Sequence, residues 1–196
     1  DDNVMTIFPR MWNGTKHSYI STYEQYADKS KMTPVTMKKS DGTSETVLRP
    51  TFMQNLRYFI GYQCNHMYWR YFMWNFVGRQ NDIQGHGELN NGNWISGIKF
   101  IDDARLGDQT NLPRSLENSG RTAFYFLPLI LGLIGLFYHL KRDMNNSWVV
   151  FLLFFMTGLA IVIYLNQTPF QPRERDYAYA GSFYAFSIWI GIGVLA

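Results

Sequence analysis

Three long apolar runs fill the last 75 residues of the chain, and they constrain its fold more than any other feature. The first run covers residues 122–140, the second covers residues 148–165, and the third begins near Gly181 and continues to Ala196. None of them carries an Asp, Glu, Lys or Arg side chain. A helix rises about 1.5 Å per residue, so about 18–20 residues cross a hydrocarbon core roughly 30 Å thick. The runs therefore predict three membrane-spanning helices, with Pro128 expected to bend the first.

The distribution of charge divides the chain near residue 121. Residues 1–121 carry 14 of the 18 Lys and Arg residues and 12 of the 15 Asp and Glu residues. The predicted fold class is therefore mainly α: a polytopic α-helical membrane protein with an irregular, partly helical extramembrane segment at residues 1–121 and a transmembrane region at residues 122–196. Because the chain opens without Met and stops inside an apolar run, we expect it to be an internal fragment of a longer protein.

One strong helix is predicted in the polar part of the chain, at about residues 51–77. Thr51 fits the N-cap position, and Gln54 three residues later completes a capping-box pattern. Gly78 follows the helix and suits a left-handed C-terminal cap. The flanking segments show no helix or strand periodicity and are predicted to be irregular: residues 1–50 and residues 78–121.

The second half of this helix is unusually aromatic. Residues 67–77 contain six aromatic residues and two methionines, and Arg70 is their only charge. Tyr and Trp favour the headgroup region of a membrane, where the ring is buried and the polar tip stays wet. The pattern predicts a helix that lies at the membrane interface or against the transmembrane bundle. A core helix of a small soluble domain is the alternative.

Composition excludes several classes of protein. The formal net charge is only +3 at pH 7, and no stripe of Lys and Arg points to nucleic-acid binding. A single cysteine, Cys64, rules out an intrachain disulfide and a cysteine-based zinc site. The sequence contains no phosphate loop, dinucleotide fingerprint or nucleophile elbow, so we predict neither a cofactor nor a metal.

The most pointed charged motif lies between the second and third apolar runs. Four consecutive residues alternate in charge: Arg173, Glu174, Arg175 and Asp176. The planar donor fork of Arg suits phosphate and carboxylate groups, and near a membrane it can bind a lipid phosphate. The alternative is an interfacial anchor whose charges pair among themselves.

A second polar cluster follows the aromatic helix. Its candidate binding residues are Arg79, Asn81 and Asp82, which could contact sugar hydroxyls or simply end the helix. Asp82, His86 and Glu88 also form a D-x-x-x-H-x-E pattern, but this spacing matches no closed set of metal ligands. A solvated loop is the more common origin of such a pattern.

Three strings carry a resemblance to a known family: residues 67–85 (MYWRYFMWNFVGRQNDIQG), 126–140 (FLPLILGLIGLFYHL) and 164–186 (YLNQTPFQPRERDYAYAGSFYAF). They resemble a large membrane family of Bacteroidetes-type bacteria, long catalogued as a domain of unknown function. That family is similar to the transmembrane protein O-mannosyltransferases of the GT-C glycosyltransferase superfamily. The resemblance extends from about Arg49 onward.

The resemblance implies an inner-membrane glycosyltransferase that moves a sugar from a polyprenyl-phosphate carrier to Ser or Thr of an exported protein. It also implies that Arg173 and Arg175 contact the lipid phosphate, with Glu174 and Asp176 orienting them. The catalytic acid is expected upstream of this chain, so the fragment by itself should be inactive.

The short basic link at residues 141–147 favours the cytoplasmic side, which places residues 1–121 and the 166–180 loop on the periplasmic face. Two other functions stay open: a transporter or flippase for a lipid or sugar, and a non-enzymatic envelope scaffold. A transporter usually carries ionisable residues within its spans, and the apolar runs contain no Asp, Glu, Lys or Arg.

Overall fold

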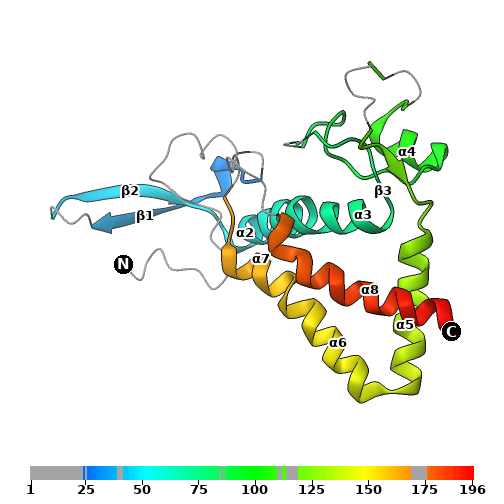
Figure 1. The fold of residues 1–196 in the computed structure, drawn as a ribbon. Coiled ribbons are helices and arrows are strands. Elements are labelled where there is room, and N and C mark those ends of the chain that lie inside the picture. The colour runs from blue at the N-terminus through cyan, green and yellow to red at the C-terminus, as the bar shows by residue number, and fades with distance from the viewer. Residues whose placement is uncertain are drawn as a thin grey trace. The chain divides into compact units, whose positions relative to one another are not determined.

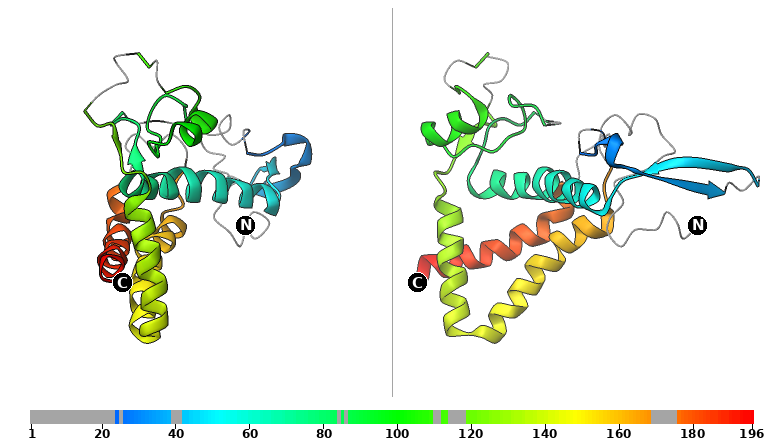
Figure 2. Two further views of the ribbon diagram at one scale, coloured as in Figure 1. Left: turned by 90° about the vertical axis from the view of Figure 1, so that its right-hand side faces the viewer. Right: turned by 180° about the vertical axis from the view of Figure 1, so that it is seen from behind.

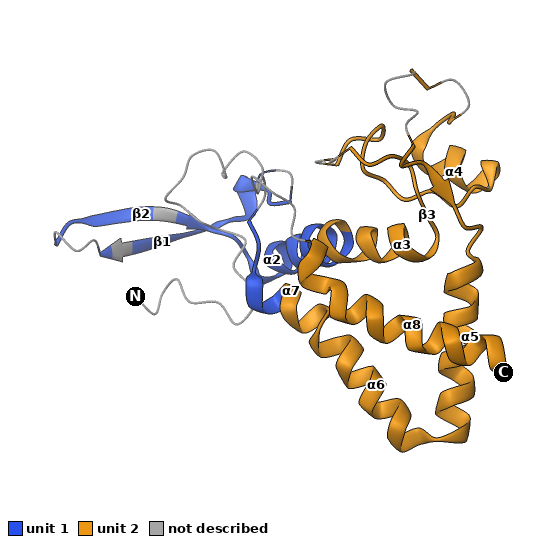
Figure 3. Cartoon of the chain, in the orientation of Figure 1, with its two compact units in different colours: residues 1–65, 163–172 blue, residues 66–162, 173–196 orange. Residues whose placement is uncertain are grey.

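The computed structural model describes residues 24, 26–38, 42–83, 85, 87–109, 112–113, 119–168 and 176–196. The chain divides into two compact units (Figure 3). Unit 1 combines residues 1–65 with residues 163–172, and unit 2 combines residues 66–162 with residues 173–196.

A β-hairpin is the main feature of the N-terminal part of unit 1 (Figure 1). Strand β1 (Thr33–Lys38) pairs antiparallel with β2 (Ser44–Arg49), and Thr33 faces Arg49 across the ladder. A short 3-10 helix, η2 (Lys29–Lys31), precedes β1. The prediction that residues 1–50 are irregular is therefore wrong for the two strands. Strand β1 alternates Val and Met with Thr and Lys over only a few residues, which is too short a pattern to stand out from the polar sequence around it.

Helix α2 (Phe52–Tyr58) begins with the predicted capping box. The backbone N–H of Gln54 donates to Thr51 Oγ1 at 3.4 Å, and the backbone N–H of Thr51 donates to Gln54 Oε1 at 2.8 Å. This pair satisfies two of the backbone donors that a helix leaves open at its N-terminus. Gln54 Nε2 also donates to the carbonyl of Asp28 at 3.0 Å, which ties the helix start to the segment before η2.

The helix then changes its winding. Residues Phe59–Trp69 form a π-helix, η3, and Arg70–Phe76 return to an α-helix, α3. Val77 is the C-cap residue, and Gly78 follows it with a φ of 150°. A Cβ on Gly78 would lie 2.6 Å from the carbonyl oxygen of Ile95, so both the backbone angle and the close approach require glycine.

Beyond α3, unit 2 contains a small layer of strand and helix. Strand β3 (Gly78–Arg79) pairs antiparallel with β4 (Thr122–Ala123), and α4 (Lys99–Leu106) lies between them in sequence. The prediction that residues 78–121 are loop is wrong for α4. Its buried residues are Asp102 and Leu106, so a carboxylate replaces one of the apolar residues by which an amphipathic helix is usually recognised.

The first apolar run is not a membrane span. Its first residues, Thr122–Ala123, form β4, and Tyr125 and Phe126 follow with positive φ angles of 53° and 60°. Helix α5 (Leu127–Arg142) begins only after this turn and has 16 residues. At about 1.5 Å per residue it is roughly 24 Å long, and its last residues include Lys141 and Arg142. Pro128 lies in the first turn of α5 and does not bend it.

Within the described part of the chain, two helical stretches are long and apolar enough to cross a membrane: Met144–Leu165 and Asp176–Leu195. The first contains α6 (Met144–Met156) and α7 (Leu159–Leu165); the second contains η4 (Asp176–Tyr179) and α8 (Ala180–Leu195). The predicted fold class, a polytopic membrane protein with three spans, is therefore wrong. Two such helices are by themselves only weak support for a membrane protein, and small sheets accompany the helices.

Helix α8 packs against both α5 and α6 (Figure 2). The crossing with α5 depends on small residues. A Cβ on Gly135 of α5 would lie 2.7 Å from the backbone nitrogen of Gly193 of α8, so the two backbones touch there. Ala185 of α8 is also fully buried. Close backbone approach of this kind suits helices that lack a polar interface.

The aromatic helix packs its rings into this bundle. Phe72 and Phe76 of α3 lie with their ring centroids 4.8 and 4.6 Å from that of Phe186 of α8. Phe186 in turn lies 6.2 Å from Trp189. Edge-to-face pairs of this kind add to the free energy gained by burial of the rings. The aromatic stretch thus lies against the apolar helices of unit 2, a position that fits both a helix packed on a membrane bundle and a core helix.

Candidate functional site

The structure describes only part of the predicted site. Arg173, Glu174 and Arg175 lie outside the described residues. Asp176 begins η4 and is exposed to solvent. The predicted role of this motif in binding a lipid phosphate stays a prediction.

Arg79, the first residue of the second predicted cluster, belongs to β3. Its backbone pairs with Thr122 of β4 and bridges to Trp94. Its guanidinium lies 4.9 Å from the centroid of the Trp74 ring, where the ring quadrupole attracts a cation. Arg79 is half-buried, so strand pairing and stacking hold a charged group at the surface of unit 2.

Asn81 and its neighbour Gln80 are fully buried. Asn81 Nδ2 donates to the carbonyl of Asn90 at 3.0 Å, and Asn81 Oδ1 accepts from the backbone N–H of Gly92 at 3.1 Å. Gln80 Nε2 donates to the carbonyl of Leu89 at 3.0 Å. The segment 88–93 is irregular, so its backbone groups are not paired within a helix or sheet. The side-chain amides of Gln80 and Asn81 serve as hydrogen-bond partners for some of these groups. The structure therefore separates this cluster: Asn81 is enclosed by the loop, whereas Asp82 is exposed.

Arg70 is a further residue with a defined role in this region. It is 6% exposed, and its Nη1 donates to the carbonyl of Gly92 at 2.6 Å. Its Nε donates to the carbonyl of His66 at 3.0 Å, and the guanidinium lies 4.4 Å from the Tyr71 ring centroid. The sequence marks Arg70 as unusual, because it is the only charged residue in the aromatic stretch. Without the fold, nothing indicates that it holds the loop at Gly92.

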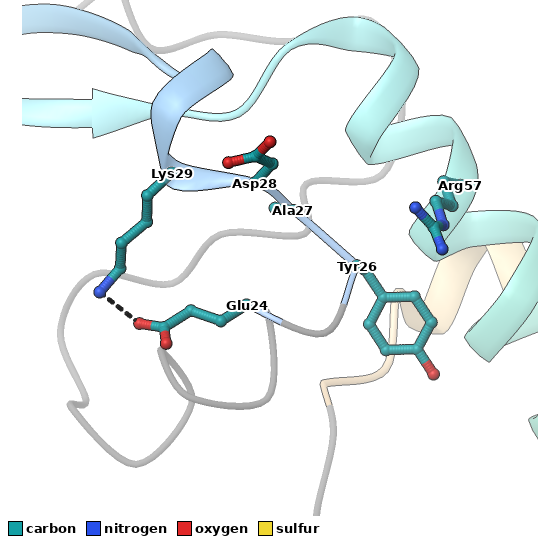
Figure 4. A pocket seen from close by; sticks show the side chains of 6 residues that line it. All are labelled: Glu24, Tyr26, Ala27, Asp28, Lys29 and Arg57. Carbon is teal, nitrogen blue, oxygen red and sulfur yellow. Dashed lines mark ion pairs between the residues drawn. The ribbon is translucent and has the colours of Figure 1, made fainter.

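Unit 1 contains a pocket of about 390 Å³ that the sequence does not indicate. Figure 4 shows that the side chains around it come from the segment before β1 and from α2. Its lining consists of Glu24, Tyr26, Ala27, Asp28, Lys29 and Arg57.

Three of the charged groups that line this pocket already have partners: Glu24, Asp28 and Lys29. Lys29 Nζ lies 2.5 Å from Glu24 Oε1. The Asp28 carboxylate accepts from the Ser30 hydroxyl at 2.7 Å and from the Ser30 backbone N–H at 3.0 Å, and these bonds hold the pKa of Asp28 below its ordinary value. Both pairs are exposed and screened, so they shape the pocket more than they stabilise the fold.

Tyr26 lines the pocket and packs on Tyr58, which lies behind it outside the lining. The Tyr26 ring meets the Tyr58 ring edge to face at 5.3 Å, and Tyr58 donates its hydroxyl to the carbonyl of Gln167 at 2.9 Å. Burial raises the pKa of the Tyr26 phenol, and the charge on Arg57 acts in the opposite direction. At neutral pH the pocket therefore offers a neutral phenol and a guanidinium, which suit a small polar ligand.

No group of three or more His, Cys, Asp or Glu side chains that could hold a metal ion occurs among the described residues. His86 of the D-x-x-x-H-x-E pattern lies outside them.

Comparison with known families and proteins adds one similarity. Residues 1–60 match the model of a family described as "Family of unknown function (DUF8416)". All residues that line the pocket in unit 1 fall within this matched stretch. No curated protein matches the chain, and no solved structure does.

Proposed function

We propose that this chain associates with a membrane, with the apolar surfaces of α6 and α8 in contact with lipid acyl chains. The observation that carries the proposal is the exposure of α6 and α7. Only 11% of the most apolar window in Met144–Leu165 is buried within the protein. A core helix of a soluble protein would be mostly covered.

The exposed side chains on α6 are large and apolar. Val149 is 65% exposed and Leu152 is 53% exposed, and α6 contains no Asp, Glu, Lys or Arg residue. Transfer of such surface from water contributes about 25 cal/mol per Å². Contiguous apolar surface of this kind on a soluble protein marks an interaction site or an aggregation hazard. A bilayer is the partner that covers an apolar helix without requiring a complementary polar rim.

Fluorescent labelling in vesicles tests this proposal. Leu152→Cys in a Cys64→Ser background would carry an environment-sensitive dye on α6, and Thr36→Cys in the same background would carry it on β1. With phosphatidylcholine vesicles we expect a blue shift for the label at residue 152 and little change for the label at residue 36. An unshifted spectrum at residue 152, with the protein bound and helical, would contradict the proposal.

For the full-length protein we also propose glycosyl transfer at the outer face of a bacterial inner membrane. The donor would be a polyprenyl-phosphate-linked sugar, and the acceptor would be Ser or Thr of an exported protein. The support is the resemblance of the three strings to the GT-C-like family, together with the position of Arg79 at the surface of unit 2. In this proposal Arg173 and Arg175 bind the lipid phosphate and Asp82 contacts the sugar or acceptor.

The activity is tested in membranes that contain the full-length parent, a radiolabelled polyprenyl-phosphate sugar and periplasmic acceptor protein. We expect label transfer that falls at least tenfold on Arg175→Ala or Arg173→Ala, because each removes a charge-assisted contact to the leaving phosphate. Arg142→Ala, in the last turn of α5, is the control. Equal transfer in all three variants would remove the assigned roles, and no transfer from several donors would favour a transporter or scaffold.

A further inference from the structure

A second cavity lies in unit 2 where β4 leads into α5. Its volume is about 380 Å³. Figure 1 shows α4 and the paired strands β3 and β4 at the N-terminal end of α5. The groups that matter for binding are two carboxylates, two cations and one aromatic ring: Asp102, Asp103, Lys99, Arg121 and Tyr125.

The two carboxylates of this cavity already accept hydrogen bonds. Asp102 Oδ1 accepts from the Ser96 backbone N–H at 2.7 Å and from the Ser96 hydroxyl at 3.0 Å. Asp102 Oδ2 accepts from the Gly97 backbone N–H at 2.8 Å. Asp103 Oδ1 accepts from the Gln109 backbone N–H at 3.4 Å. Both carboxylate oxygens of Asp102 are therefore occupied by hydrogen bonds from the turn before α4.

The two cations, Arg121 and Lys99, have fewer partners than the carboxylates within the described part of the chain. Arg121 Nη1 is shielded from solvent and has no hydrogen-bond partner among the described residues. Neither Arg121 nor Lys99 forms an ion pair within that part of the chain. A shielded guanidinium donor without an acceptor costs about 1–3 kcal/mol. If the Arg121 side chain turns its guanidinium into the cavity, a bound acceptor recovers this free energy.

One wall of the cavity contains residues with unusual backbone angles. Tyr125 and Phe126 both have positive φ angles, 53° and 60°, which are uncommon for residues other than glycine. Gly97 has a φ of 83°, and a Cβ on it would lie 2.8 Å from Tyr125 Cε1. The Tyr125 ring therefore packs directly on the Gly97 backbone. Strained residues of this kind cluster at binding sites, where they fix a side chain in place.

We propose that this cavity binds a phosphoryl group, with Arg121 and Lys99 as its cationic contacts. The guanidinium fork matches the oxygens of a phosphate, and an ammonium group adds a mobile point charge. The volume exceeds that of a phosphate alone, so the cavity also accommodates part of the group to which the phosphate is attached.

The phosphate can come from a lipid headgroup or from a soluble phosphate ester, and the placement of the cavity favours the lipid. Leu127 and Ile130, in the first turn of α5, are 61% and 49% exposed. A headgroup in the cavity would leave its acyl or prenyl chain beside these apolar side chains. This choice of source, unlike the phosphate site itself, rests on the proposed membrane association.

The test uses the full chain in detergent micelles and on vesicles. In micelles, inorganic phosphate and glucose 1-phosphate are titrated by calorimetry against the wild type, Arg121→Gln, Lys99→Gln and the control Arg142→Gln. On vesicles, flotation compares phosphatidylcholine alone with phosphatidylcholine that contains undecaprenyl phosphate. We expect Arg121→Gln and Lys99→Gln each to weaken phosphoryl binding by about tenfold, the equivalent of one charge-assisted contact. Arg142→Gln should bind as the wild type does.

Calorimetry and flotation together distinguish a lipid phosphate from a soluble phosphate ester. They also test the phosphoryl site separately from the membrane association. Stronger flotation with undecaprenyl phosphate, lost in Arg121→Gln, supports a lipid phosphate; binding of glucose 1-phosphate without that gain supports a soluble ester at the same site. Equal binding of phosphoryl probes by all four proteins, each with its helical circular dichroism intact, would overturn the site. Failure to float on phosphatidylcholine alone contradicts the membrane association and leaves the calorimetric result to decide the site.

Discussion

The phenolic oxygen of Tyr68 lies 2.6 Å from the hydroxyl oxygen of Ser182, which joins η3 to α8 inside unit 2. Both side chains are buried, and a Cβ on Gly158 would lie 2.7 Å from each of the two oxygens. The Tyr179 ring meets the Tyr68 ring edge to face at 5.4 Å. A polar contact thus lies within a largely aromatic interface, where an unpaired hydroxyl would be costly.

Removal of either hydroxyl should destabilise the protein. Tyr68→Phe and Ser182→Ala each delete one partner and leave the other buried, at a cost of about 1–3 kcal/mol. The double variant should cost less than the sum of the two, because neither partner is then left alone. Chemical unfolding in detergent micelles, followed by circular dichroism, measures these free energies. Tyr184→Phe, whose ring is 70% exposed, is the control; strict additivity would argue against the contact.

The same contact predicts a pH dependence. Burial raises the pKa of Tyr68 to about 12, and the hydrogen bond with Ser182 acts in the opposite direction. In the unfolded chain a tyrosine titrates near pH 10. Because the folded pKa is the higher one, the contribution of Tyr68 to stability is complete below about pH 10 and is lost as pH rises toward 12. The free energy of unfolding of Tyr68→Phe should fall less steeply over this window than that of the wild type; parallel curves would contradict the assignment.

Two glycines of α8 should respond differently to the same substitution. A Cβ at position 193 would meet the Leu131 carbonyl oxygen and lie 3.1 Å from the backbone nitrogen of Gly135, so Gly193→Ala must separate α5 from α8. We expect a loss of about 1–3 kcal/mol. Gly191 has nothing within 4 Å of the corresponding position, and Gly191→Ala should be neutral or stabilise the helix by up to about 1 kcal/mol. Thermal unfolding of both variants in the same detergent checks this; an equal effect would place the helix contact elsewhere.

The capping box of α2 predicts a graded series. Thr51→Ala should reduce the free energy of unfolding by about 1 kcal/mol, because the Gln54 backbone N–H loses its acceptor. Thr51→Ser keeps the hydroxyl and should cost much less. Gln54→Glu retains the acceptor for the Thr51 N–H but removes the donor to Asp28, so an intermediate loss is expected. A Thr51→Ser variant as unstable as Thr51→Ala would show that the methyl group, not the cap, matters.

Asp102 should be a strong structural carboxylate. Asp102→Ala removes the acceptor for two backbone N–H groups, those of Ser96 and Gly97, and should cost about 2–4 kcal/mol. Amide hydrogen exchange at these two residues should accelerate more than exchange elsewhere in unit 2. Asp103→Ala, which removes one long contact at 3.4 Å, is the matched control. Unchanged exchange at Ser96 and Gly97 in Asp102→Ala would contradict this role.

Local signals in the sequence were sufficient where a few adjacent residues decide the structure. The capping box at Thr51 and Gln54 is one example, and the end of the aromatic helix just before Gly78 is another. Both depend on backbone groups within one turn of the residue concerned. The sequence grouped Arg79, Asn81 and Asp82 by composition. It did not show that Asn81 is buried and Asp82 exposed, because the partners of Asn81 lie in a loop of no regular pattern.

Apolar composition by itself overestimated the number of helices that are long and apolar enough to cross a membrane. Residues 122–140 have the length and uncharged character of a span, yet Thr122–Ala123 pair with β3 and the chain turns at Tyr125 before α5 starts. Strand pairing between residues more than forty positions apart leaves no trace in a hydropathy pattern. The cavity beside Arg121 escaped prediction for the same reason, since its walls come from α4, β4 and the turn between β4 and α5.

What the sequence by itself determined is the position of the helix cap at Thr51, the aromatic stretch around Phe72 and the apolar character of α6 and α8. These properties depend on side-chain type at local spacing, which the chain carries before it folds. Only the tertiary structure decided that Phe72 and Phe76 pack on Phe186, that Tyr68 meets Ser182, and that two rather than three helices are long and apolar enough to cross a membrane. Those outcomes depend on which distant backbone groups become neighbours, because pairing and close packing are properties of the folded chain.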